Sequence, residues 1–302
     1  MSKRNLNKVQ KSAVESFGKP VLIFAGAGSG KTRVLTHKIA HLIDKDLVSA
    51  QNILAVTFTN KAAQEMRERV SKLLKNKNTS VNLGTFHSIC ARILRKEIHH
   101  LGYTADFSIF DVKDQVTLVK VVLEAMDIPK NYVTPQEVRH KISYFKNKLI
   151  HPDEAQSKAH LVIEKTYAEI YKNYQKALFE NNAVDFDDLL ILPLKLFEKN
   201  PKVLEKYRED WQYILVDEYQ DTNKPQFMLI KYLAGSHKQV CVVGDDDQSI
   251  YGWRGADIRN ILDFEKTFGN CEVFKLEKNY RSSGHILEAA SSVVKNNDNR
   301  AP

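Results

Sequence analysis

The stretch at residues 21–32 reads Val21-Leu22-Ile23-Phe24-Ala25-Gly26-Ala27-Gly28-Ser29-Gly30-Lys31-Thr32. It begins with an apolar run of the length of a buried strand, and residues 33–43 after it carry apolar side chains at helical spacing. Between a strand and a helix, glycines let backbone N–H groups turn inward around phosphates, and the helix N-terminus adds partial positive charge. Lys31 can then reach the outer phosphates, and the Thr32 hydroxyl can ligate Mg²⁺. The stretch predicts a phosphate-binding loop rather than a structural bend, although Ala25 stands where the pattern usually has its first glycine.

A second stretch supplies the acidic partner that such a loop needs. Four apolar residues, Tyr213 to Val216, are followed at once by Asp217 and Glu218. In nucleoside triphosphatases the first carboxylate holds the Mg²⁺ shell, and the second can accept a proton from the attacking water. Two adjacent acids after an apolar run are common on their own. Together with Lys31 and Thr32, they predict a nucleoside triphosphatase.

Length and composition fit a globular protein of about two domains, because 302 residues contain 43% hydrophobic and 27% charged residues. The net charge of +8 is compatible with a polyanionic partner, although a solvated basic surface is the commoner explanation of such a value by itself. Cys90, Cys241 and Cys271 form no CxxC pair, so neither a disulfide framework nor a zinc site is predicted. The N-terminus lacks an apolar signal core, and the strongest apolar stretch, Leu189 to Phe197, contains Pro193 and Lys195. We therefore expect a cytoplasmic protein without a membrane partner.

Several candidate residues lie just beyond predicted strands, where ligands bind in open α/β sheets. Residues 52–60 form a strand that ends in polar residues, and there Phe58 can either fill the core or stack on a base. After residues 81–83 comes His87, which by itself is more typical of a structural histidine. After residues 239–243, Gln248 suits the sensing of a γ-phosphate. Tyr251, Trp253 and Arg254 follow it and suit a platform for stacked single-stranded nucleic acid, although such aromatics usually pack into the core.

Both ends of the chain add candidates for nucleotide contacts. Residues 6–10 open a short helix, and Gln10 offers a donor beside an acceptor, which matches adenine N6 and N7. A surface glutamine at a helix start is the alternative. After the last predicted strand, residues 273–276, Tyr280 can stack on a base and Arg281 can reach a phosphate, though nothing local requires either role.

The middle of the chain has a different sequence pattern. From about Phe110 to Tyr174, polar helical segments replace strands, at residues 112–126, 134–148 and 154–179. This pattern predicts a helical insertion into one discontinuous α/β domain. Within it, a basic cluster can contact phosphates, but a solvated helical face is the simpler interpretation; its members are Arg139, His140, Lys141, Lys146 and Lys148. Asp185 precedes the helix that begins near Asp187, and a helix cap explains it better than a metal site.

Taken in order, these segments resemble the UvrD/Rep/PcrA-like group of superfamily-one DNA helicases. The similar motifs span nearly the whole chain: LNxxQ at 6–10, AGAGSGKT at 25–32, TFTNKAAQEM at 57–66, GTFHS at 84–88, DFDDLL at 185–190, VDEYQDTN at 216–223, GDDDQSIYGWRGA at 244–256 and LEKNYRSS at 276–283. The resemblance implies a RecA-like P-loop NTPase fold of class α/β, a parallel sheet flanked by helices with an inserted all-helical accessory domain. It implies domains at 1–109 (motor, first segment), 110–184 (insert) and 185–283 (motor, second segment), with 284–302 starting a connection to a second motor domain.

The resemblance also implies roles for individual residues. Catalysis would involve Lys31, Glu218, Gln248 and Arg281, and Thr32 with Asp217 would organise Mg²⁺. ATP would be bound by the phosphate loop, Ala25, Gly26, Ala27, Gly28, Ser29, Gly30, Lys31 and Thr32, together with Gln10, Arg33, Tyr280 and Arg281. Single-stranded DNA would meet Phe58, Asn60, His87, Tyr251, Trp253 and Arg254.

The activity implied by the resemblance is ATP-dependent translocation 3′ to 5′ on single-stranded DNA, with unwinding at single-strand/duplex junctions during repair or replication. Family members continue into a second motor domain with further motifs, including an arginine that completes the ATP site. This sequence stops at Pro302, so we expect a truncated chain with impaired unwinding, because a missing arginine can cost on the order of 10³ to 10⁵ in rate. The alternatives are a non-enzymatic ATP- and DNA-binding fragment and the helicase part of a recombination helicase–nuclease.

Overall fold

The structure is a computed structural model that describes residues 6–75, 80–129, 131–235, 237 and 239–295, without the side chain of Arg254. It divides into two compact units, each described below by itself. The first comprises residues 1–86, 204–223 and 230–302, and the second comprises residues 87–203 and 224–229. The predicted domain boundaries stay predictions, and the last part of the predicted 284–302 connection, from residue 296 on, lies outside the described residues.

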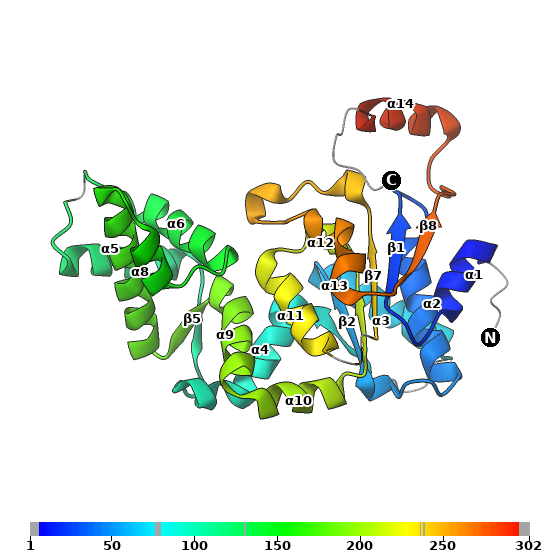
Figure 1. Ribbon diagram of the computed structural model, residues 1–302, viewed down its shortest axis with the longest axis horizontal. Coiled ribbons are helices and arrows are strands. Elements are labelled where there is room, and N and C mark those ends of the chain that lie inside the picture. Colours follow the sequence, from blue (N-terminus) through cyan, green and yellow to red (C-terminus); the bar gives the residue numbers. More distant parts are fainter. Residues whose placement is uncertain (1–5, 76–79, 130, 236, 238, 296–302) are drawn as a thin grey trace. The chain divides into compact units, whose positions relative to one another are not determined.

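The first unit is built on a six-stranded sheet in the order β3-β2-β6-β7-β1-β8, in which every pair of neighbours is parallel. The strands are β1 (Val21–Ala25), β2 (Ile53–Thr57), β3 (Asn82–Thr85), β6 (Tyr213–Val216), β7 (Val240–Gly244) and β8 (Glu272–Leu276). Figure 1 shows β1 between β7 and β8, and the register places Leu22 opposite both Val242 and Val273. The predicted α/β fold with a parallel sheet flanked by helices is therefore confirmed.

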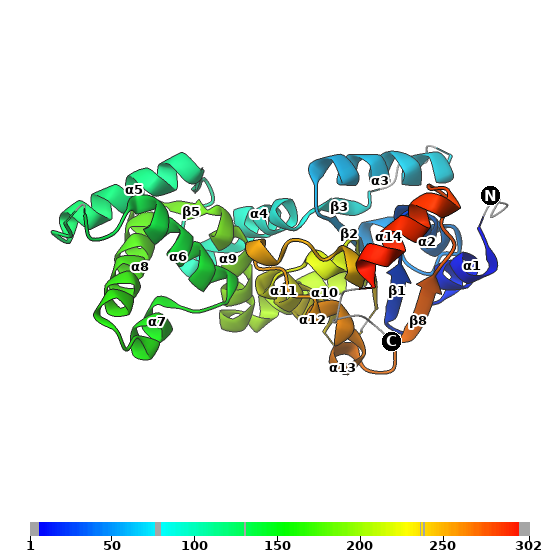
Figure 2. The ribbon, with the colours of Figure 1, turned by 90° about the horizontal axis from the view of Figure 1, so that it is seen from above.

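Helices cover both faces of this sheet. The helices that belong to this unit alone are α1 (Lys8–Glu15), α2 (Lys31–Asp44), α3 (Asn60–Leu73), α12 (Arg259–Leu262), α13 (Phe264–Phe268) and α14 (Gly284–Val294), of which α14 buries no residue. Figure 2 shows α2 and α3 on one side of the sheet and α12 and α13 on the other. Apolar side chains of α1, α2 and α3, such as Val14, Leu35 and Met66, form one buried core with alternate strand residues, including Ile23 and Leu215. Two further helices, α10 (Pro201–Asp210) and α11 (Lys224–Ala234), contribute residues to both units.

Because all six strands are parallel, the loops at their carboxyl ends gather at one edge of the sheet. The glycine-rich loop follows β1, Phe58 follows β2, and Asp217 follows β6. Gly244, the last residue of β7, leads to Asp245 and Gln248, and the loop after β8 carries Tyr280. The topology thus assembles the candidate residues of the first unit at the edge where the sequence predicts them.

The second unit is mainly helical. Its helices are α4 (Phe86–Glu97), which begins one residue before the unit, α5 (Val112–Ala125), α6 (Pro135–Asn147), α7 (Pro152–Lys158), α8 (Val162–Glu180) and α9 (Phe186–Lys199). Two short parallel strands, β4 (Ser108–Phe110) and β5 (Ala183–Asp185), accompany them, and the sequence did not predict these strands. Asp185 caps α9 by accepting a hydrogen bond from the Asp188 N–H at 2.8 Å, so its predicted capping role is confirmed.

Two predictions about the helical segment are wrong. Residues 154–179 form two helices rather than one, because the Glu164 carboxylate accepts hydrogen bonds from the N–H groups of His160 and Leu161 and starts α8 afresh. Lys146 belongs to no solvated basic face. Its side chain is fully buried and lies 2.7 Å from Asp185 Oδ2 and 2.8 Å from Asp188 Oδ1. Burial of a charge requires such partners, which neighbouring residues in the sequence did not reveal.

No helix in the described ranges of either unit combines the length and the apolar character needed to cross a membrane.

Candidate active site

The glycine-rich loop joins β1 to α2 through a turn that a side chain at Gly28 would disrupt. Gly28 adopts φ of +70°, and a Cβ built there would lie 2.6 Å from Arg281 Cβ and 2.8 Å from Asn279 Nδ2. Glycine reaches this left-handed backbone region without strain. The loop continues to Gly30, the N-cap of α2, so that Lys31, Thr32 and Arg33 form the first turn of that helix. Unpaired N–H groups at a helix N-terminus favour anions.

Gln10 lies against this loop. Its side chain is buried, its Nε2 donates to Ser29 O at 2.9 Å, and its Oε1 accepts from the Asn7 N–H at 3.1 Å. The Asn7 side chain in turn caps α1 by accepting from the Gln10 N–H at 2.8 Å. These contacts use one N–H and one lone pair of the Gln10 amide, which has a second of each. The surface-glutamine alternative is wrong, whereas adenine recognition stays a prediction.

The loop after β8 holds the glycine-rich loop from the other side. The Tyr280 N–H donates to Gly28 O at 2.9 Å, and Asn279 Nδ2 donates to Ala27 O. Asn279 Oδ1 also accepts from the N–H groups of Arg281 and Ser282, both at 2.8 Å. The Tyr280 ring is half exposed and its hydroxyl accepts from Asn7 Nδ2 at 3.0 Å. The start of α1 and the loop after β8 thus both contact the glycine-rich loop, and Asn279, which sequence analysis overlooked, joins this loop to residues 281 and 282.

Lys31 faces two carboxylates from different strand ends. Its Nζ lies 3.3 Å from Glu218 Oε2 and 3.8 Å from Asp245 Oδ2. Glu218 follows β6 and adopts φ of +49°, an uncommon backbone conformation for a non-glycine residue, and such conformations cluster at active sites. Burial and the adjacent Glu218 charge raise the pKa of Asp217 to about 7, and its Oδ1 accepts from the Glu218 N–H at 3.1 Å. Asp245 is a neighbour of Lys31 that the sequence did not single out.

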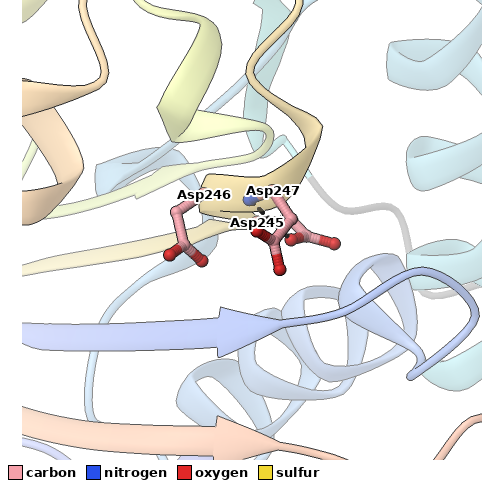
Figure 3. Close-up of side chains that lie close together, drawn as sticks. All are labelled: Asp245, Asp246 and Asp247. Carbon is pink, nitrogen blue, oxygen red and sulfur yellow. Dashed lines mark hydrogen bonds between the residues drawn. The ribbon is translucent and has the colours of Figure 1, made fainter. Parts of the chain in front are cut away.

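Three consecutive carboxylates follow β7, as Figure 3 shows. Oxygen atoms of Asp245, Asp246 and Asp247 lie within 4.8 Å of one another. Hard oxygen donors of this kind, like those of Thr32 and Asp217, suit Mg²⁺. The Gln248 amide donates to Asp245 Oδ2, which joins the predicted γ-phosphate sensor to the same turn. Three acidic residues in a row after a strand are the sequence signal that could have identified this turn.

Gln220 connects the two acidic segments from within the protein. Its buried Nε2 donates to Glu218 Oε2 at 3.0 Å and to Asp221 Oδ2 at 3.3 Å, and its Oε1 accepts from the Asp245 N–H at 3.0 Å. The Gln220 carbonyl accepts from Ser249 Oγ at 3.3 Å. Gly244 leaves room for this arrangement, since a Cβ there would lie 2.6 Å from Gln220 Oε1. In the sequence, a single glutamine two residues beyond the acidic pair does not indicate any role by itself.

Aromatic rings form an open row at the same edge of the sheet. The centroids of Phe58 and Tyr251 lie 6.3 Å apart with an interplanar angle of 17°, and those of Tyr251 and Trp253 lie 6.4 Å apart. Trp253 is 75% exposed, so it is not a core residue. Asn60, exposed, begins α3 nearby in sequence. The predicted contact through Arg254 concerns a side chain outside the described part of the structure.

His87 is the one predicted DNA contact in the second unit. Its ring makes an edge contact with Phe186 at a centroid distance of 6.1 Å, and burial lowers its pKa. A neutral, half-buried imidazole suits either a structural histidine or a hydrogen bond to a ligand.

Comparison with known proteins is consistent with this geometry. Residues 6–269 match the family model described as "UvrD/REP helicase N-terminal domain". The chain is 50% identical over 297 residues to "ATP-dependent DNA helicase PcrA" of Bacillus subtilis, covering 98% of this chain and 40% of that protein. It is 49% identical over 299 residues to the protein of the same name in Staphylococcus epidermidis, covering 99% and 41%. For Staphylococcus aureus the identity is 50% over 298 residues, with the same coverage. The chain thus spans about two fifths of the length of these relatives.

Proposed function

The chain belongs to the UvrD/REP helicase family, and from this premise we propose that it forms the ATP-binding half of an ATP-dependent DNA helicase. In this proposal ATP hydrolysis drives movement 3′ to 5′ on single-stranded DNA and opens the duplex at single-strand/duplex junctions. The observation that carries the proposal is the approach of Lys31 to Glu218 and Asp245 at the end of the phosphate loop.

Lys31 is poised to exchange carboxylate partners for phosphates. The Lys31 side chain is 11% exposed, and its ammonium lies 3.3 Å from Glu218 and 3.8 Å from Asp245. A γ-phosphate oxygen can take the place of either carboxylate as the partner of this ammonium. Once phosphates occupy Lys31, the Glu218 carboxylate is released to accept a proton from water. Arg281 is assigned to the same phosphates, because its Cβ lies close to Gly28 of the phosphate loop.

Thr32 and Asp217 are the residues that would hold Mg²⁺. Their hydroxyl and carboxylate oxygens are the ligands this ion prefers, and the buried Asp217 carboxyl is the group whose negative charge a cation would offset. When bound, Mg²⁺ supplies neutralisation of charge on the phosphates. The Glu218 N–H donates a hydrogen bond to the Asp217 carboxylate and orients it. Asp217 is thus assigned to Mg²⁺ and Glu218 to the water.

Adenine recognition is assigned to Gln10, Tyr280 and Arg33. Gln10 is fixed on Ser29 O, and Tyr280 is fixed on Gly28 O and by Asn7, so a donor–acceptor pair and a half-exposed ring both lie at the phosphate loop. Arg33, in the first turn of α2, would flank the ring from the other side.

Single-stranded DNA is assigned to the open aromatic row of Phe58, Tyr251 and Trp253, with Asn60, His87 and Arg254 as further contacts. Base stacking on aromatic rings tolerates any sequence, which suits a translocating protein. Gln248 and Ser249 lie between this row and Asp245 in sequence and bond to Asp245 and Gln220, respectively. This is a route by which the γ-phosphate and DNA can influence each other.

We propose further that these residues by themselves unwind DNA poorly and hydrolyse ATP slowly, because they span about two fifths of the length of their relatives. Repair or replication proteins are the expected protein partners. A non-enzymatic ATP-binding module is the rival function, but such a module has no use for a carboxylate such as Glu218 beside Lys31.

The test is steady-state ATP hydrolysis by this chain with single-stranded DNA, with single-stranded RNA and without nucleic acid, using Glu218→Gln as the control. We expect measurable ATP binding and slow hydrolysis that DNA increases and the substitution abolishes. No ATP binding, or hydrolysis that Glu218→Gln leaves intact, would contradict the proposal.

A further inference from the structure

A lysine on the phosphate-loop helix is buried far from any phosphate site. Lys38 lies on α2 and its side chain is inaccessible to solvent. Its Nζ donates to Ala13 O at 2.9 Å and to Ser16 O at 2.7 Å, and it lies 5.8 Å from the centroid of the Tyr213 ring. A lysine is almost never fully buried unless it is paired, so these contacts call for an explanation.

The two acceptors of Lys38 lie at the C-terminal end of α1. Ala13 belongs to the last turn of this helix and Ser16 is its C-cap. The last carbonyls of a helix lack intrahelical partners and carry the negative end of the helix dipole. A buried ammonium therefore satisfies both carbonyls and fastens this end of α1 to α2. Burial lowers the pKa of Lys38, while the nearby Cys241 and Glu272 act in the opposite direction.

The other end of α1 carries Gln10. This helix has eight residues and is thus about 12 Å long. Gln10 stands in its first turn, and its amide reaches Ser29 O of the phosphate loop. A helix this short is marginal without tertiary anchors, so the position of Gln10 depends on both ends of α1 being held.

We propose that Lys38 is a positioning residue for base selection, anchoring the end of α1 to the phosphate-loop helix so that Gln10 is held where adenine is recognised. The inference rests on the proposed function, because it assigns Lys38 to the adenine part of the same site. Lys38 touches no nucleotide. It acts through α1 and Gln10.

A positioning role makes a prediction that a merely structural role does not. The phosphate contacts would come from backbone N–H groups of the loop and from the first turn of α2, whereas α1 meets this loop through the Gln10 bond to Ser29 O. Loss of the anchor should therefore weaken the recognition of adenine and spare the recognition of phosphates. A general loss of stability would weaken both together.

The experiment measures binding of ATP, GTP and inorganic tripolyphosphate to the full chain, each by displacement of a fluorescent ATP analogue. Lys38→Met removes the donors at similar length. Lys11→Met, at an exposed lysine of α1, is the matched control for lost charge, and Lys38→Arg restores donors. We expect Lys38→Met to lower the ATP-over-GTP preference about five- to tenfold, the size of one hydrogen bond. Tripolyphosphate binding should stay within about twofold of the wild type.

The outcomes separate the inference from the proposed function. If wild type binds neither ATP nor tripolyphosphate, the proposed function fails. If wild type and Gln10→Ala differ in base preference but Lys38→Met retains the full preference, the inference alone is overturned. Equal losses for ATP and tripolyphosphate would also overturn it, because they indicate a structural role. Should Lys38→Met be unfolded at the assay temperature, Lys38→Leu, which also has no donor, replaces it, and retention of full base preference there has the same consequence.

Discussion

The Lys31 ammonium and the Glu218 carboxylate lie 3.3 Å apart at the ends of two strands that are not neighbours in the sheet. β1 delivers the first and β6 the second, with β7 between them. Gln220 also donates a hydrogen bond to Glu218. The Glu218 carboxylate therefore keeps a defined position both when Lys31 pairs with it and after Lys31 binds phosphate instead.

Gly28→Ala should disable the phosphate loop without unfolding the sheet. The new Cβ would lie 2.6 Å from Arg281 Cβ in a backbone conformation that alanine rarely adopts. We expect ATP affinity to fall at least about tenfold and stability to fall by about 1–3 kcal/mol, measured by nucleotide titration and thermal unfolding. Gly284→Ala, at a site with open space and no positive φ, is the control and should change neither quantity. Wild-type affinity in Gly28→Ala would show that the loop tolerates the clash.

Gln220→Ala should separate ATP binding from hydrolysis. It removes the donor to Glu218 and the acceptor for the Asp245 N–H, while Lys31 and the phosphate loop are untouched. We expect the turnover number and its stimulation by single-stranded DNA to fall about ten- to a hundredfold, with the dissociation constant for ATP within about threefold of wild type. Gln64→Ala on the exposed face of α3 serves as control. Full DNA stimulation in Gln220→Ala would rule out a connecting role for this side chain.

Trp253→Ala should weaken binding to single-stranded DNA. The indole is 75% exposed at the end of the aromatic row, and a stacked base contributes about 1–3 kcal/mol. Fluorescence anisotropy with a labelled oligonucleotide should therefore show a loss of about five- to a hundredfold. Tyr132→Ala removes an exposed ring elsewhere and should have little effect. Equal DNA affinity in Trp253→Ala and wild type would refute the stacking platform.

Asp188→Asn should change how stability depends on pH. Burial, with the nearby Asp185 charge, raises the pKa of Asp188 to about 6, above its ordinary value of 3.8. A raised carboxyl pKa means that the folded state binds the proton more tightly, so this group's stabilising contribution is full below pH 4 and is lost as pH rises through 6. We expect wild type to lose on the order of 3 kcal/mol relative to Asp188→Asn between pH 4 and 7.

Urea unfolding of both proteins at several pH values measures the difference in their free energies of unfolding. The titration of the other carboxyls contributes equally to both proteins and cancels in this difference. A constant difference across the range would mean that Lys146, which lies 2.8 Å from Asp188, keeps the carboxylate charged throughout.

Much of the first unit was predictable because local patterns determine it. The apolar run before Ala25 and the glycines up to Gly30 specify strand, turn and helix, and the four residues before Asp217 specify β6. Parallel topology then brings their ends to one edge, so the proximity of Lys31 and Glu218 followed from general rules about sheets.

Other features depend on contacts between distant segments and leave no local signal. Asn279 reads as a loop residue until the structure places its amide on Ala27 O. Gln220 could face solvent or protein with the same neighbours in sequence. Lys146 looked solvated among basic residues, yet its partners Asp185 and Asp188 lie on another element. Hydrophobic periodicity describes which face is buried, but not which polar group is paired there.

The most direct test of the central claim is calorimetric titration of ATP with Mg²⁺ into the full chain, comparing wild type, Lys31→Met and Lys45→Met. Both lysines belong to α2 or its C-cap, but Lys31 faces Glu218 at the phosphate loop and Lys45 is exposed at the far end. We predict one site in wild type and Lys45→Met, and at least about a tenfold weaker site in Lys31→Met. Equal affinity in all three proteins would contradict the assignment of this loop as the ATP site.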